Sequence, residues 1–169
     1  MRTFAVESLK RNGQVILALY DSLRAEQLLW RPSPEKWSLV EILHHLYDEE
    51  REDFRLRLQS VLKDPLQPFQ PIDPGGWVRS RNYQARPVAE LLSGFSEERA
   101  ASVQWLSSLD VPDWEVANIH PKFGPMSAGT LLSSWVAHDL LHIRQITATK
   151  FQYATEMCAP YENQYAGDW

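Results

Sequence analysis

The segment from Ser127 to Lys150 predicts a long helix, and this helix constrains the rest of the chain. The segment contains no proline, and apolar residues recur in it at helical spacing, at Leu131, Leu132, Trp135, Val136, Ile143 and Ile146. Ser127 is available as the N-cap. Residues four apart lie one turn above each other on a helix, so His138 and His142 point the same way. Two imidazoles in this arrangement can bind a metal ion from a single helix.

The histidine pair alone does not establish a metal site, because two histidines at this spacing also arise by chance. The helical zinc-protease motif places Glu directly after the first His, whereas Asp139 stands there in this chain, so that protease class is not predicted. Asp139 must face away from the metal, and we expect it to have a surface or capping role. Gln145, one turn past His142, is expected to close the site by hydrogen bonding. A third ligand has to come from another segment.

Composition favours a single domain over residues 1–169. The chain has 169 residues, of which 44% are hydrophobic, and this is enough for one ample core. The net charge of −5 provides no basic surface for nucleic acid, and no apolar run approaches the roughly 20 residues that span a membrane. The first residues lack an apolar signal core, and the lone Cys158 excludes an internal disulfide. We therefore expect a cytoplasmic protein with no nucleic-acid or membrane partner.

Three further helices are predicted from apolar periodicity, over residues 3–24, 39–62 and 87–109. The second of these has a complete start signal. Ser38 is its N-cap and Glu41 follows three residues later, which gives the two halves of a capping box. Trp37 and Ile42 are placed to form the hydrophobic staple that accompanies such a cap.

A long proline-rich segment separates the second and third predicted helices. The prolines favour an extended path and argue against a helix between Asp64 and Trp77; they are Pro65, Pro68, Pro71 and Pro74. The span from Lys63 to Arg86 is long enough to traverse a bundle, which allows the second and third helices to run parallel. A ligand for an SH3-type domain is the alternative interpretation of these prolines.

Two other segments are expected to lack regular structure. Residues 110–126 form a predicted loop, in which His120 is expected to be solvated rather than a ligand. The tail after Lys150 is expected to pack over the bundle or against a partner subunit through its aromatic residues, which are Phe151, Tyr153, Tyr161, Tyr165 and Trp169.

The second predicted helix offers two candidates for the third ligand, the adjacent residues His44 and His45. Adjacent residues are about 100° apart around a helix and cannot both face one point. Both fall beside the apolar stripe, so helical periodicity does not choose between them.

Two motifs resemble those of a known family. Trp37-Ser38-x-x-Glu41-x-x-x-His45-Leu46 resembles the first signature of the DinB-like (YfiT-like) metal-binding four-helix bundles, and His138-x-x-x-His142-x-x-Gln145-Ile146 resembles the second. The resemblance covers nearly the whole chain. It implies an all-α four-helix bundle of up-down-down-up order, with a long crossover loop between the second and third helices. It also implies one divalent metal ion bound by His45, His138 and His142, with His44 as a bystander.

Three neutral imidazoles leave at least one coordination position of a divalent ion open, which is typical of catalytic zinc sites. Imidazole suits several metals, so the ligands do not identify the ion, and we expect zinc or nickel. The open position serves a water molecule or a thiolate. The family that the chain resembles includes thiol transferases and metal-dependent hydrolases, so the resemblance implies either activity. We expect transfer of a low-molecular-weight thiol to an electrophilic small-molecule substrate, in a protein that forms a homodimer.

The alternatives are a metal-dependent hydrolase that uses bound water, a non-catalytic metal-binding stress protein, and a bundle whose histidines lie in the core without metal. Glu49 lies one turn below His45 and is the candidate catalytic residue, as a base or as a group that orients a ligand. Asp48 and Glu50 are expected to be solvated. A surface position, with recognition of a substrate carboxylate as the alternative, is expected for Arg79, Arg81 and Arg144.

Overall fold

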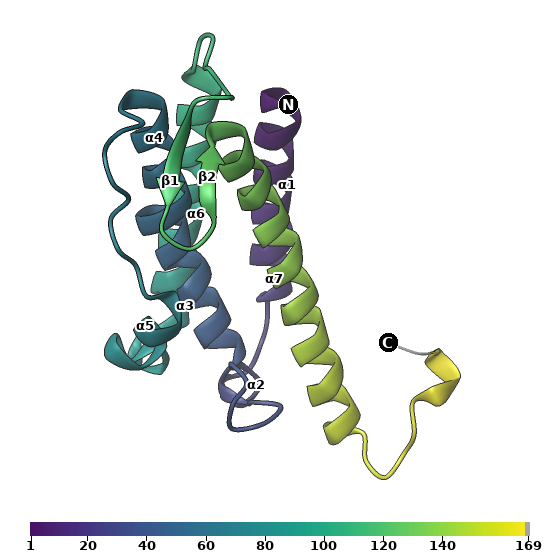
Figure 1. Cartoon of the computed structure of the whole chain (residues 1–169). Helices are drawn as coiled ribbons and strands as arrows, with labels where there is room; N and C mark the ends of the chain where they lie inside the picture. The colour runs from purple at the N-terminus through teal and green to yellow at the C-terminus, as the bar shows by residue number, and fades with distance from the viewer. Residues whose placement is uncertain (168–169) are drawn as a thin grey trace.

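The computed structural model of the chain describes residues 1–167 and is built mainly of helices (Figure 1). Four long helical segments form a bundle: α1 (Arg2–Leu19), a second helix made of α3 (Leu39–Glu49), η1 (Glu50–Phe54) and α4 (Arg55–Lys63), then α6 (Val88–Ser108) and α7 (Ala128–Met157). The connections carry α2 (Ala25–Leu29), α5 (Pro74–Ser80), η2 (Tyr83–Ala85), β1 (Ala117–His120) and β2 (Gly124–Ser127), and η3 (Gln164–Ala166) follows α7. The predicted all-α four-helix bundle is confirmed.

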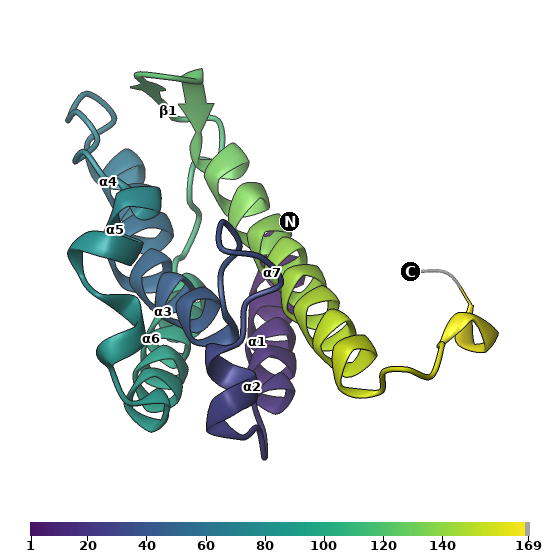
Figure 2. The ribbon, with the colours of Figure 1, turned by 90° about the horizontal axis from the view of Figure 1, so that it is seen from below.

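The helices have the predicted order of directions. In Figure 1, α1 and α7 run downward, whereas α3–α4 and α6 run upward. The second and third bundle helices are therefore parallel, and the chain between them crosses the full length of the bundle. α1 packs against both α6 and α7, and the view from below in Figure 2 places it between them. α3 packs against the same two helices from the other side.

Both predicted N-caps are present at the helices that carry the histidines. The backbone N–H of Ser38 donates to Glu41 Oε2 at 2.8 Å, and the capping box is complete. Ser127 Oγ accepts a hydrogen bond from the backbone N–H of Thr130 at 3.1 Å. The sequence therefore specifies locally where both helices begin.

The crossover segment corrects one prediction. No helix forms from residue 64 to residue 73, as expected, but Pro74 begins the short helix α5, which contains Trp77. Proline at the first helical position needs no hydrogen-bond donor and has a suitable φ, so it starts a helix as readily as it ends one. Asp73 caps this helix by accepting from the backbone N–H of Gly76 at 3.0 Å.

The segment predicted as a loop over residues 110–126 contains an antiparallel hairpin. β1 pairs with β2 in a register that joins Ala117 to Ser127 and His120 to Gly124. Gly124 has φ +73°, which a tight turn requires and which glycine adopts without strain. The ring of His120 lies 4.8 Å from that of Phe123, and its Nδ1 accepts from backbone N–H groups. His120 takes no part in the histidine cluster described below.

The last helix is longer than predicted, since α7 continues past Lys150 to Met157. Tyr153 packs over the bundle, with its ring 5.5 Å from that of Trp30 in an edge-on contact. Tyr161 and Tyr165 are 81% and 106% exposed, so the expectation that they cover the bundle is wrong. Trp169 lies outside the described residues.

The core consists of two apolar clusters with a polar layer between them. One cluster includes Leu9, Leu58, Leu106, Leu132 and Trp135, and the other includes Ile16, Leu43, Leu91, Phe95 and Ile146. Between these two sets, each bundle helix carries a buried polar residue: Asn12, Glu50, Arg99 and Asp139. Arg99 of α6 lies in this layer and is 5% exposed.

The guanidinium of Arg99 forms hydrogen bonds with groups from the other three helices. It donates to the carboxylate of Glu50 at 2.9 and 2.8 Å, to that of Asp139 at 2.7 and 2.8 Å, and to the backbone oxygen of Leu9 at 2.8 Å. Trp135 Nε1 donates to Glu50 at 3.1 Å. Burying an ion pair costs solvation free energy unless all its groups are hydrogen-bonded, and here the arginine uses every N–H.

We predict that Arg99→Met lowers the free energy of unfolding by about 3–5 kcal/mol, because it leaves two carboxylates buried without a cation. Arg144→Met is the control, since Arg144 is exposed on α7, and a change within about 0.5 kcal/mol is expected. Urea denaturation followed by circular dichroism measures both variants. Equal midpoints for the two variants would show that the buried pairs contribute nothing.

Candidate metal centre

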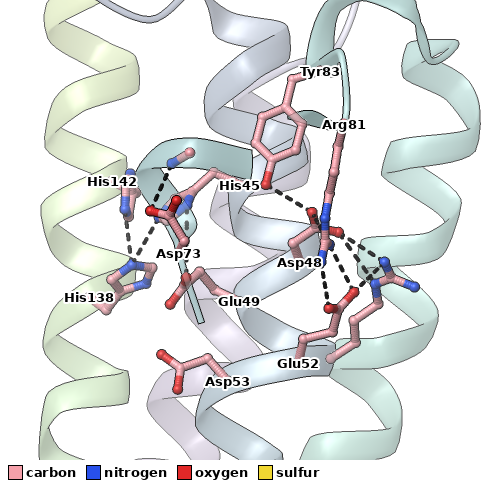
Figure 3. A network of polar contacts seen from close by, with 12 residues as sticks. His45, Asp48, Glu49, Glu52, Asp53, Asp73, Arg81, Tyr83, His138 and His142 are labelled. Atoms are coloured by element: carbon pink, nitrogen blue, oxygen red, sulfur yellow. Dashed lines mark hydrogen bonds and ion pairs between the residues drawn. The ribbon is translucent and has the colours of Figure 1, made fainter. Parts of the chain in front are cut away.

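Three histidines from two helices converge on one point beside the polar layer (Figure 3). His45 comes from α3, and His138 and His142 come from successive turns of α7. His138 Nε2 lies 3.3 Å from His45 Nε2 and 3.1 Å from His142 Nε2. One ring nitrogen from each residue lies within 4.8 Å of the others. The structure thus brings together all three residues that the resemblance implies as ligands.

The spacing of these nitrogens fits a bound ion. Nitrogens held tetrahedrally at about 2.05 Å from a metal are about 3.3 Å apart, close to the two shorter separations here. A neutral imidazole has one protonated and one unprotonated ring nitrogen. Three ring nitrogens that face one another therefore leave lone pairs without a hydrogen-bond donor. A cation accepts all three lone pairs at once, so the donor set suits a divalent metal.

Gln145 fixes the ring of His142, as predicted from its position. Its Oε1 accepts a hydrogen bond from His142 Nδ1 at 2.8 Å. With the proton held on Nδ1, the lone pair of His142 Nε2 faces the other histidines. A hydrogen bond of this kind orients a metal-binding histidine and raises its basicity.

The electrostatic setting keeps all three rings neutral. Burial lowers the pKa of His45 to about 3, and the neighbouring His142 acts in the same direction. Burial also lowers the pKa of His138 and that of His142. Neutral imidazole is the form that binds metal, so the rings need no deprotonation near pH 7.

Aromatic side chains pack against two of the three rings, and His44 lies on another face of its helix. The ring centroid of Trp37 lies 5.0 Å from that of His45, and Phe54 lies 4.9 Å from His138. His44 stacks on Tyr83 instead, with ring centroids 3.9 Å apart. Of the two adjacent histidines, only His45 joins the cluster.

Glu49 is the acidic residue next to this cluster. Its side chain is buried, and its Oε1 lies 4.0 Å from His45 Nδ1, too far for a hydrogen bond. Neither of these two atoms has a hydrogen-bond partner within the part of the chain that the structure describes. Burial raises the pKa of Glu49 to about 9, and the nearby carboxylate of Asp53 adds to the effect.

Asp53 is a neighbour of the site that the sequence analysis missed. It is buried, and its Oδ1 lies 2.5 Å from Arg57 Nε, so its charge is compensated. It follows Glu49 by four residues and His45 by eight, so the spacing along one helical face is the signal that points to it. The residues from Glu50 to Phe54 form a π-helical turn, a rare feature often found at functional sites.

Two predictions about charged residues near the site are wrong. Asp48 and Glu50 were expected in solvent and Asp139 at the surface, yet all three side chains are buried. Asp48 accepts from Arg81 at 2.6 Å, while Glu50 and Asp139 bind Arg99. Asp48 also pairs with Arg51 of its own helix at 3.1 Å, whereas Arg81 and Arg99 come from other segments, and these cations explain how the carboxylates remain in the interior.

A second polar network ties the crossover segment to the second helix (Figure 3). Arg81 donates to Asp48 and, at 2.8 Å, to Glu52 Oε2, and its guanidinium lies 4.0 Å from the ring centre of Trp77. Tyr83 donates its hydroxyl to Asp48 at 2.8 Å. Arg81 therefore has a structural role, whereas the other two arginines considered at the sequence level, Arg79 and Arg144, are exposed.

Comparison with known proteins agrees with this architecture. The sequence pattern of the DinB superfamily matches residues 8–146. The chain belongs to the DinB superfamily. Among solved structures, it resembles YfiT from Bacillus subtilis, described as a probable metal-dependent hydrolase with an unusual four-helix bundle topology. The TM-score is 0.81 at 17% sequence identity, over 90% of this chain and 87% of YfiT.

The likeness to YfiT establishes the fold of this DinB-superfamily chain and not its activity. No curated protein matches the sequence. Within residues 1–167, no helix is long and apolar enough to cross a membrane.

We predict that His45→Ala lowers metal affinity by more than about a hundredfold, because even the hydrogen-bond partners of metal ligands contribute 10- to 100-fold. His44→Ala is the matched control and is expected to retain near-normal occupancy, since His44 stacks on Tyr83. Titration of each metal-free variant with zinc, followed by calorimetry, measures both affinities. Loss of binding in His44→Ala alone would place the ligand one residue earlier, and mild effects in both would assign the ion to other residues.

Proposed function

We propose that this DinB-superfamily protein is a metal-dependent hydrolase of small molecules, with one divalent ion, zinc or nickel, bound by His45, His138 and His142. The convergence of three neutral imidazoles beside a buried carboxyl carries the proposal. That carboxyl belongs to Glu49, whose Oε1 has no hydrogen bond among the described residues. The description of YfiT as a probable metal-dependent hydrolase supports the same assignment.

The residues around the site have separate tasks in this reaction. A divalent ion held by these three imidazoles would supply an open coordination position for water and Lewis acidity toward a carbonyl. Gln145 keeps the proton of His142 on Nδ1. Trp37 and Phe54 pack against the other two rings and help to hold them in place. Glu49 takes the proton of the attacking water and passes it to the leaving group.

The charge on Glu49 follows from the same arrangement. In the absence of a metal ion, burial and Asp53 favour the protonated carboxyl and outweigh the opposing effect of Arg57. Positive charge close to a carboxylate favours its ionised form, so a divalent ion at the histidines acts against the burial. Glu49 is then available as a base when the site is loaded.

We predict that the purified protein binds about one divalent ion per chain, since three imidazoles make one site. Binding is expected to persist below about pH 6 and to weaken only in more acidic solution, because the ligands must be neutral and burial lowers the pKa of all three below the roughly 6.5 of free imidazole. Elemental analysis after dialysis at pH 7.5 and pH 5 measures the stoichiometry. Absence of stoichiometric metal at pH 7.5, even after reconstitution, contradicts the proposed centre.

Activity measurements separate hydrolysis from the thiol transfer that the family resemblance implies. The metal-loaded protein is expected to hydrolyse members of an ester and amide panel, and Glu49→Gln to lower kcat by about a hundredfold or more. Metal occupancy is expected to be unchanged in this variant. Glu52→Gln is the control, because Glu52 pairs with Arg81 on another face of the helix.

Two other results would replace the hydrolase assignment. Turnover that requires a low-molecular-weight thiol and an electrophile would assign thiol transfer, since a thiolate binds at the same open position. Full metal occupancy without turnover in either panel would assign a metal-binding stress protein. A cytoplasmic location, a homodimer and a single domain over the whole chain remain predictions from the sequence.

A further inference from the structure

An open cleft of about 490 Å³ adjoins the histidine cluster. The loop before α3 forms one side of it and α5 with the following residues forms the other. Its lining includes Arg31, Lys36, Trp37, Gly75, Val78 and Arg79. None of these residues is among the three histidines or the acids described above.

Trp37 connects the cleft to the candidate metal centre. Its side chain lines the cleft, and its ring centroid is 5.0 Å from that of His45. A molecule in the cleft therefore lies one indole ring away from a histidine of the cluster. Trp37 and Val78 also give the cleft an apolar surface for a carbon skeleton.

The charge in the cleft favours an anion. Three cations and two carboxylates line it, and Arg31 is paired with the buried Glu41. Lys36 and Arg79 form no ion pair or side-chain hydrogen bond with any described residue. The remaining carboxylate, Glu35, is exposed and accepts from Ser33 Oγ at 2.9 Å. Apart from the pair of Arg31 and Glu41, the lining thus carries two cations and one exposed anion, an excess of one positive charge in a chain whose net charge is −5.

We propose that this cleft binds the carboxylate of a small organic acid, with Lys36 and Arg79 as its partners and Trp37 against its carbon skeleton. Guanidinium and ammonium groups bind carboxylates through charge-assisted hydrogen bonds. Binding of the acid in the cleft does not depend on the proposed function. Only its identification as the substrate rests on that function. The cleft recognises the part of the molecule that does not react.

Gly75 provides a way to block the cleft without disturbing its walls. A Cβ added at Gly75 has no other atom within 4 Å, so a larger side chain there extends into open space. At the neighbouring Gly76, a Cβ would lie 1.9 Å from Asp73 Oδ2 and would disrupt the cap of α5. Gly75 lines the cleft, so Gly75→Leu adds a bulky side chain at its wall, and Gly76 is left unchanged.

The test compares 2-naphthoate with its neutral amide, 2-naphthamide, by calorimetry on the full-length metal-free chain and again on the zinc-loaded chain. Naphthoate is expected to bind the metal-free chain about fivefold more tightly than the amide, which is the upper range for exposed ion pairs. Arg79→Gln and Lys36→Gln are each expected to remove most of that preference, while Arg144→Gln on α7 retains it. Gly75→Leu is expected to weaken both probes.

Several results overturn the proposal. These are equal affinity for the two probes, no binding to the metal-free chain, an Arg79→Gln variant that behaves like Arg144→Gln, or unchanged binding in Gly75→Leu. Binding seen only with zinc assigns the carboxylate to the metal and also overturns it. If the cleft variants weaken naphthoate binding as expected but the protein hydrolyses no ester, the anion site is supported. In that case only the hydrolase assignment fails.

Discussion

One buried guanidinium holds the bundle in register. Arg99 of α6 has five N–H donors, and the structure gives each an acceptor on α1, the second helix or α7. All five hydrogen bonds form together only when each helix has a suitable rotation about its axis and a suitable position along it. A Cβ at Gly13 would lie 3.0 Å from Arg99 Cγ, so the glycine lets this side chain pass close to α1. Apolar residues in place of all the buried charges would often cost little stability, whereas removal of Arg99 alone leaves its acids unpaired, so we infer that the cluster contributes mainly to how the four helices are aligned.

The same constraint sets the directions of the site residues. Each carboxylate that binds Arg99 immediately follows a residue of the candidate site: Asp139 follows His138, and Glu50 follows Glu49. Adjacent residues on a helix are about 100° apart, so an acid that points at Arg99 directs its neighbour toward the next face. That face is where α3 and α7 meet. The ion pairs thereby orient His138 and Glu49 without touching either.

The features that could be predicted from the sequence are those set by residues close together in the chain. The four helices, both N-caps and the parallel crossover follow from periodicity, capping residues and prolines. Periodicity left His44 and His45 equivalent, and only the family resemblance selected the one that joins the cluster. The burial of Glu50 and Asp139 was beyond local reasoning, because Arg99 lies 49 and 40 residues away from them. Asp48 has a local cation in Arg51, but its second one, Arg81, lies 33 residues away. No signal in the apolar pattern marks the π-helical turn, since tertiary contacts determine whether it forms.

Three consecutive acids of the second helix have different environments, and the difference singles out Glu49 as the one without an ion pair to an arginine. Asp48 binds Arg81 of the crossover, and Glu50 binds Arg99 in the core, so each has its negative charge balanced. Glu49 lies between them with no arginine partner, an oxygen without a hydrogen bond and a pKa raised to about 9. A buried carboxyl in this condition is costly in a purely structural role. In the proposed function, a divalent ion at the three histidines would supply the missing charge, and the least stabilised acid of the three would be the one suited to proton transfer.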